Sequence, residues 1–230
     1  MSLRPFVRRS GAILGAVLLL AVAGCGGEND GEEPESPSET LVRFVEAAGA
    51  SDAEAMWADL SAGTREHWGP TLDEFRAGVA LELAEGLGSF AQADYEVALG
   101  EQVSDGLGVA AIEGARTVEG MEEYAAYAAA LVTEDGAWKL ALDRPSIVPL
   151  EPGQGASVSA PDRARARAEG AEGLDDARMW LDGAELESVE RRGDSIEAPL
   201  DGLGQGPHSL VVYVADGGEP AATAWTFTVE

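Results

Sequence analysis

The apolar residues of this 230-residue chain change their spacing near residue 90, and this change limits the possible folds more than any other feature. Before it, the capping-box pattern occurs three times, at Ser36–Glu39, Ser51–Glu54 and Thr71–Glu74. Apolar residues follow each of these at helical spacing. The third helix is expected to continue to about residue 85. After the change, apolar and polar residues alternate as in strands. Helices followed by antiparallel strands predict an α+β fold over residues 37–147.

One stretch of the strand region, residues 122–130, is ambiguous. Its alanines favour a helix by propensity. Its place ahead of a hairpin favours a strand, because Glu134-Asp135-Gly136 is a turn signal and alternating apolar residues follow it. We therefore expect a strand there.

A second domain is predicted beyond a Pro- and Gly-rich linker at residues 148–156. Apolar runs separated by turn signals over residues 157–230 predict a β-sandwich. In RARARAEG, the arginines at 163, 165 and 167 alternate with alanines, and we expect them to pair with nearby carboxylates, with a basic ligand patch as the alternative. Tyr213 lies off the apolar face of Leu210 and is interpreted as a candidate surface contact.

The charge balance excludes some partners. The chain has 42 acidic and 15 basic residues, for a net charge of −27. Such a chain repels nucleic acid and anionic lipid headgroups, so no nucleic-acid partner is expected and membrane attachment needs something other than charge. A solvated surface is the favoured interpretation of the acidity, and an acidic cation site is the alternative.

The N-terminus carries the second strong signal. Three arginines precede GAILGAVLLLAVAG, which as a helix would span roughly 21 Å, less than the roughly 30 Å of a bilayer core. This pattern predicts a secretory signal peptide over residues 1–24. The following Val22-Ala23-Gly24-Cys25 resembles the lipobox of bacterial lipoproteins, which implies acylation of Cys25, for example with palmitate. The alternative is an ordinary cleavage site with a chance cysteine.

Residues 25–36 are rich in acidic residues, Gly, Pro and Ser, and predict a disordered tether. With the lipobox, they imply an extracytoplasmic protein anchored by lipid to a bacterial membrane. Gly26 stands where some Gram-negative lipoproteins carry an inner-membrane retention aspartate, which favours the outer membrane in such a cell.

The segments LVRFVEAAGASDAEAMWADLS and VTEDGAWKLAL resemble the nuclear-transport-factor-2-like superfamily, which includes SnoaL-like proteins. The resemblance implies a cone of helices on a curved sheet around a pocket, where the enzymes of the superfamily place their acids and bases. Asp94 and Glu96 share one strand face and are the candidate pocket carboxylates, with a solvent-facing position as the favoured alternative. His67 is interpreted as an exposed turn residue.

The C-terminal stretch GPHSLVVYVADGGEPAATAWTFTVE resembles the end of bacterial Ig-like modules. The resemblance implies a spacer or adhesion module and a structural role for His208. The residues that carry it are Gly206, His208, Asp216, Gly218, Trp225, Phe227 and Val229.

Two functions follow from these features. The favoured one is a lipid-anchored, extracytoplasmic, non-catalytic binding or scaffold protein of a bacterial envelope, whose partner is an envelope protein or a small ligand. It predicts no catalytic residue, cofactor or metal. The alternative is a SnoaL-like enzyme that uses Asp94 or Glu96 for isomerase- or dehydratase-type proton transfer.

Overall fold

The computed structural model describes the chain from the end of the predicted tether onward. The predicted signal peptide, the lipobox with Cys25 and the tether up to residue 34 lie outside the described residues. From Pro34 to the C-terminus the chain forms one compact unit. The structure describes residues 35–118, 121–142, 145–171 and 173–230.

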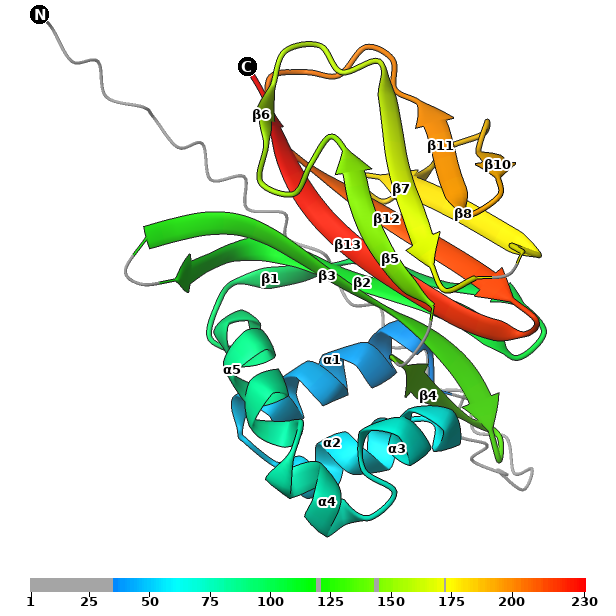
Figure 1. Cartoon of the computed structure of the whole chain (residues 1–230). Coiled ribbons are helices and arrows are strands. Elements are labelled where there is room, and N and C mark those ends of the chain that lie inside the picture. The colour runs from blue at the N-terminus through cyan, green and yellow to red at the C-terminus, as the bar shows by residue number, and fades with distance from the viewer. Residues whose placement is uncertain (1–34, 119–120, 143–144, 172) are drawn as a thin grey trace, which may run out of the picture. The chain divides into compact units, whose positions relative to one another are not determined.

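The helices come first, as predicted (Figure 1). Reciprocal capping boxes at Ser36–Glu39 and Thr71–Glu74 are confirmed. The second helix differs from the prediction, because Asp52 caps it alone by accepting from the backbone N–H groups of residues 54 and 55. The helices are α1 (Pro37–Gly49), α2 (Ala53–Asp59), α3 (Ala62–Trp68), α4 (Leu72–Ala77) and α5 (Ala80–Ala91).

The helix predicted from residue 71 to about 85 is divided into α4 and α5. Gly78 separates them with φ −106° and ψ −87°, which is not a helical conformation. Glycine lowers helix stability because it has the most backbone freedom to lose. The break lets α5 take its own direction along the sheet.

Four antiparallel strands form sheet A in the order β1-β2-β3-β4. The ambiguous stretch at 122–130 lies within a strand, as predicted. Asp135 and Gly136 both have positive φ, 51° and 81°, as a two-residue type I′ hairpin turn requires. The strands are β1 (Tyr95–Ser104), β2 (Leu107–Val118), β3 (Met121–Glu134) and β4 (Ala137–Ala141).

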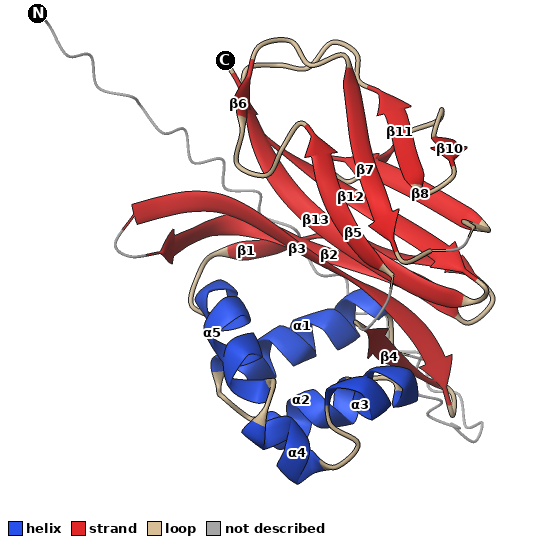
Figure 2. Ribbon diagram, in the orientation of Figure 1, coloured by secondary structure: helices blue, strands red, loops and turns tan. Residues whose placement is uncertain are grey.

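The remaining strands form two facing sheets. Sheet B has the order β10-β11-β7-β5, and sheet C has the order β6-β13-β12-β8-β9 (Figure 2). The residues predicted as a linker include most of β5, which pairs with β7. The strands are β5 (Ser146–Glu151), β6 (Ser157–Val158), β7 (Arg163–Glu169), β8 (Asp176–Leu181), β9 (Ala184–Glu185), β10 (Glu190–Arg192), β11 (Ser195–Pro199), β12 (Gly206–Asp216) and β13 (Glu219–Val229).

The arginines of β7 point away from the apolar layer, and the intervening alanines are buried. Arg163 pairs with Asp162 and Glu197, at 3.1 and 3.4 Å, and Arg165 lies 3.7 Å from Glu151. Arg167 pairs with Glu169. The predicted local pairing is confirmed, so these arginines do not form a free basic patch.

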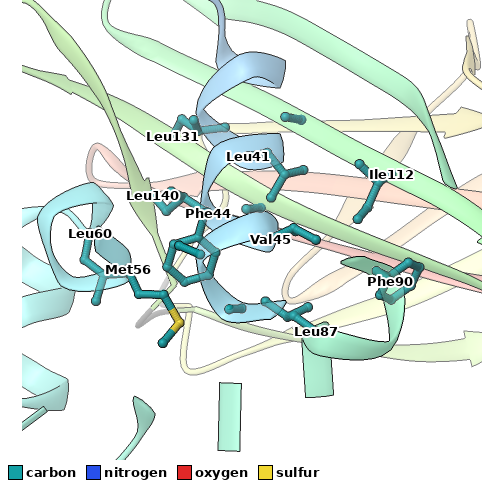
Figure 3. Close-up of a cluster of buried hydrophobic side chains, with 14 of the residues drawn as sticks. Leu41, Phe44, Val45, Met56, Leu60, Leu87, Phe90, Ile112, Leu131 and Leu140 are labelled. Carbon is teal, nitrogen blue, oxygen red and sulfur yellow. The ribbon is translucent and has the colours of Figure 1, made fainter. Parts of the chain in front are cut away.

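Three apolar layers hold the unit together. The first lies between the helices and sheet A and contains Leu41, Phe44, Val45 and Leu131 (Figure 3). The second lies between sheets B and C, where the predicted contact between the faces of Leu210 and Trp225 is confirmed. The third lies between sheet A and sheet C.

The third layer corrects the interpretation of Tyr213. Tyr213 is 0% exposed and packs in the third layer with Trp180 and Val109. It is therefore not a surface contact, because sheet A covers the face of β12 that points away from Leu210. Alternation along β12 predicts two faces, but it does not reveal what covers the second one.

Candidate functional site

A cleft of about 850 Å³ lies between α5, β3 and β13. Its walls come from α5 between Glu82 and Phe90, residues 123–127 of β3, residues 223–228 of β13, and the loop at Gln154–Gly155. This volume is in the range of small-molecule and peptide sites, which is roughly 300–1,000 Å³. The cleft is the candidate functional site.

One border of the cleft is a strand edge. β4 pairs only with residues 130–134 of β3, so within the described residues the earlier part of β3 has β2 as its sole partner strand. The hydroxyl of Thr226 donates to the carbonyl of Tyr124 at 2.9 Å, so that carbonyl points away from β2. We call residues 124–128 the free edge of β3.

Two tyrosines, Tyr124 and Tyr127, line the cleft. Burial raises the pKa of Tyr124, and the charge of Glu113 and a hydrogen bond to its carboxylate raise it further. Burial likewise raises the pKa of Tyr127, whose ring packs against the helix layer. Both hydroxyls stay protonated at neutral pH, and that of Tyr124 donates to the Glu113 carboxylate.

The charge of the cleft is negative. Glu82 and Glu123 line it, and its described lining residues include no lysine, arginine or histidine. Among the described residues, no group of three or more His, Cys, Asp and Glu side chains could hold a metal ion. Glu123 stands opposite Arg116 in the β2–β3 register.

The predicted site residues lie elsewhere. Asp94 precedes β1 and Glu96 lies within it, and both side chains are exposed and outside the cleft lining. Glu96 pairs in register with Glu113 and contributes to the raised pKa of Tyr124, so it lies near that tyrosine. His67 is exposed, as expected, but it lies in the last turn of α3 and not in a turn between elements, because Ser61 caps a helix that runs from Ala62 to Trp68.

Sequence reasoning missed the residues that border the cleft, but one signal was present. The first strand of the predicted hairpin, EEYAAYAAALVTE, is much longer than the second, AWKLA. A long strand that pairs with a short one leaves part of its edge uncovered. The other walls come from segments far apart in the sequence, and no local pattern brings them together.

His208 has the structural role that was predicted. Its Nδ1 lies 2.7 Å from Asp182 Oδ2 and its Nε2 lies 2.9 Å from the Gly204 carbonyl. Its ring stacks on Phe227 at 5.5 Å between centroids. Burial alone would lower its pKa, but the bonds to the Gly204 carbonyl and to Asp182 outweigh it, and the pKa is raised.

This raised pKa predicts a pH-dependent stability. The contribution of His208 is complete below its unfolded pKa, about 6.5, and is lost as the pH rises through the folded value. The melting temperature should therefore decline across neutral pH, and His208→Gln should flatten this decline. His67→Gln, at the exposed histidine, is the matched control and should leave the decline unchanged. Melts between about pH 5 and 9 test this, and an unchanged slope in His208→Gln would contradict it.

None of the described helices is long and apolar enough to cross a membrane. No protein-family profile matches the chain, and no curated protein matches it at the sequence level.

Among solved structures, the chain is similar to an endo-β-1,4-mannanase from Thermotoga petrophila, with 14% identity over 38% of this chain and 20% of that one, at a TM-score of 0.34. It is also similar to CopC from Methylosinus trichosporium OB3b, with 15% identity over 37% of this chain and 94% of that one, at a TM-score of 0.32. A lytic polysaccharide monooxygenase from Jonesia denitrificans shows 13% identity over 34% of this chain and 60% of that one, at a TM-score of 0.28. Similarities this low carry no argument about fold or activity.

Proposed function

We propose that the protein is a lipid-anchored, extracytoplasmic, non-catalytic binding protein of a bacterial envelope, and that its binding site is the cleft between α5, β3 and β13. The cleft carries this proposal, because it combines a ligand-sized volume with a strand edge. Its side chains can hold and orient a partner. Its tyrosines stay protonated, which suits binding more than proton abstraction.

The alternative enzyme would need convergent carboxylates between the helices and sheet A. Leu41, Phe44 and their neighbours fill that space (Figure 3), and Asp94 and Glu96 are exposed outside it. This packing supports the non-catalytic proposal.

The two family resemblances belong to the same proposal. Helices that cover one face of sheet A are a feature of the nuclear-transport-factor-2-like cone. Sheets B and C, which enclose their own apolar layer, are a feature of an Ig-like sandwich. In this proposal the sandwich supplies β13 as one wall of the cleft, so the two parts build the site together.

Two measurements in bacterial cells test this function. Cys25→Ala should abolish labelling with a palmitate analogue and release the chain from the membrane fraction, because the thiol is the proposed attachment point. A variant that still labels would remove the anchor from the proposal.

The second measurement tests the cleft. A photo-crosslinking amino acid at Thr228, an exposed cleft residue, should form a discrete adduct in the envelope. The same group at Leu81, which is exposed on α5 outside the cleft lining, is the matched control. Equal adducts at both positions, or none at Thr228, would contradict binding in the cleft.

A further inference from the structure

We propose that Thr226 is the positioning residue of the cleft, because its hydroxyl and its carbonyl join β13 to the free edge of β3 and to the loop at Gln154–Gly155. This inference rests on the proposed binding function and names the residue on which the shape of the binding site depends. It stands on hydrogen bonds, on burial and on the place of Thr226 in its strand.

Thr226 is bonded to two walls of the cleft besides its own strand. Its hydroxyl donates to the Tyr124 carbonyl at 2.9 Å, which holds the free edge of β3 against β13. Its backbone carbonyl accepts from the Gly155 N–H at 2.7 Å, which holds the loop against the same residue. Three of the four segments that build the cleft therefore meet at Thr226.

The place of Thr226 on β13 explains why a hydrogen bond is needed there. Alternate residues of β13 face sheet A. Of these, Ala222 and Ala224 pack against the third apolar layer. Thr226, the next residue on this face, is 8% exposed, and Thr228 after it is exposed. Apolar packing of β13 on sheet A therefore ends just before Thr226, and the hydroxyl makes the contact at the point where the cleft opens.

The facing side of β3 changes in the same way. Ala128 is buried in the third apolar layer, whereas Ala126 and Tyr124 on the same face are half-buried and line the cleft. Tyr124 is held from two directions, because its side chain donates to Glu113 and its carbonyl accepts from Thr226. The Thr226 hydroxyl thus reaches a residue that is fixed on its other side, and this bond sets the separation of β3 and β13.

The fourth wall does not depend on Thr226. Leu87 and Phe90 of α5 are buried in the apolar layer between the helices and sheet A, and Tyr127 of β3 packs against the same layer. When the Thr226 hydroxyl is lost, α5 and β3 therefore stay together, and β13 with its loop is free to move relative to them. A binding site that is not held in its bound shape loses affinity.

Substitutions that remove or keep the hydroxyl test the inference. Thr226→Val keeps the β-branched shape and the backbone bond to Gly155, but it cannot donate to the Tyr124 carbonyl. Thr226→Ser keeps the donor and should behave like the wild type. Thr40→Val is the matched control, because Thr40 is a buried threonine of α1, outside the cleft lining, whose hydroxyl donates to the Ser36 carbonyl at 3.4 Å.

The first measurement reports the width of the cleft without a ligand. In the full-length chain with Cys25→Ala, which removes the single native cysteine, Leu81→Cys and Gln154→Cys carry spin labels on α5 and on the loop. The distribution of distances between the two labels should broaden or shift in Thr226→Val. It should stay as in the wild type in Thr226→Ser and Thr40→Val.

The second measurement reports binding. The photo-crosslinking group at Thr228 is placed in each variant, and the yield of the envelope adduct is compared with that of the wild type. Thr226→Val should lower the yield about twofold to tenfold, which is the factor that one net hydrogen bond contributes. Thr226→Ser and Thr40→Val should keep the wild-type yield.

The outcomes separate this inference from the proposed function. A wild-type distance distribution in Thr226→Val would overturn the inference, because the walls would then hold without the hydroxyl. A broadened distribution with an unchanged adduct yield would overturn it as well, and would leave the proposed function standing. Equal losses in Thr226→Val and Thr40→Val would reduce the effect to general stability. If the wild type forms no adduct at Thr228, the proposed function fails, and the label distances alone decide whether Thr226 positions the walls.

Discussion

A chain that ends at residue 156 is expected to lose the cooperative unfolding transition of the full chain and to aggregate. The truncation removes sheet C and most of sheet B, and it uncovers the face of sheet A that now packs on β12 and β13. A continuous exposed apolar face is an aggregation surface. From sheet A, the uncovered residues are Leu99, Val103, Val109, Ala111, Ala128 and Ala130.

The size of this effect follows from the burial. Removing a leucine or valine side chain from water contributes about 1.5–3 kcal/mol, so exposing Leu99, Val103 and Val109 costs roughly 5–9 kcal/mol. A whole domain is stable by only about 5–15 kcal/mol. The truncation therefore removes a large share of the stability available to the remaining part.

Calorimetry and size-exclusion chromatography check this result. A chain of residues 35–230, which keeps the described unit, is the control and should retain one transition. A monomeric truncated chain that melts cooperatively near the temperature of that control would show that residues 37–147 fold alone, as the sequence pattern indicates.

Local signals predicted most of the elements. The capping boxes at Ser36 and Thr71 and the turn at Asp135-Gly136 depend on a few neighbouring residues, and the structure forms them as expected. The failures come where one residue changes a long pattern. Gly78 divides the helix that was expected to run from residue 71 to about 85. In β1, a register shift lies between Val97 and Leu99, and it leaves Val97 exposed while Leu99 joins the third apolar layer.

Packing between distant segments could not be predicted from one sequence. The pattern of β12 gives Val211 and Tyr213 a common face, but the strands that cover it lie about 100 residues earlier in the chain. The cleft has the same origin, because its walls come from four separate segments. The acidic residues that line it look in the sequence like any solvated glutamate. Strand alternation places Asp94 and Glu96 on one face, but it cannot distinguish a cleft wall from an open surface.

The third apolar layer contains one polar group whose removal should stabilise the protein. The hydroxyl of Tyr213 is buried and has no hydrogen-bond partner among the described residues. Burial raises the pKa of Tyr213 to about 12, so the hydroxyl remains a protonated donor. A buried donor without an acceptor costs about 1–3 kcal/mol of desolvation. Tyr213→Phe keeps the ring and removes this cost, and it should raise the free energy of unfolding by about 1 kcal/mol or more.

Tyr213→Ala measures how much the ring contributes to stability, apart from the hydroxyl. It empties the space that the ring fills between sheets A and C, and loss of a large buried aromatic side chain costs about 3–5 kcal/mol. The two variants should therefore shift urea midpoints in opposite directions, with the larger change in Tyr213→Ala. If Tyr213→Phe instead lowers the stability by 1 kcal/mol or more, the hydroxyl has an acceptor in solution and the layer is polar at this point. Opposite shifts would show that the contact between sheets A and C depends on apolar packing. The chain that ends at residue 156 loses this same packing.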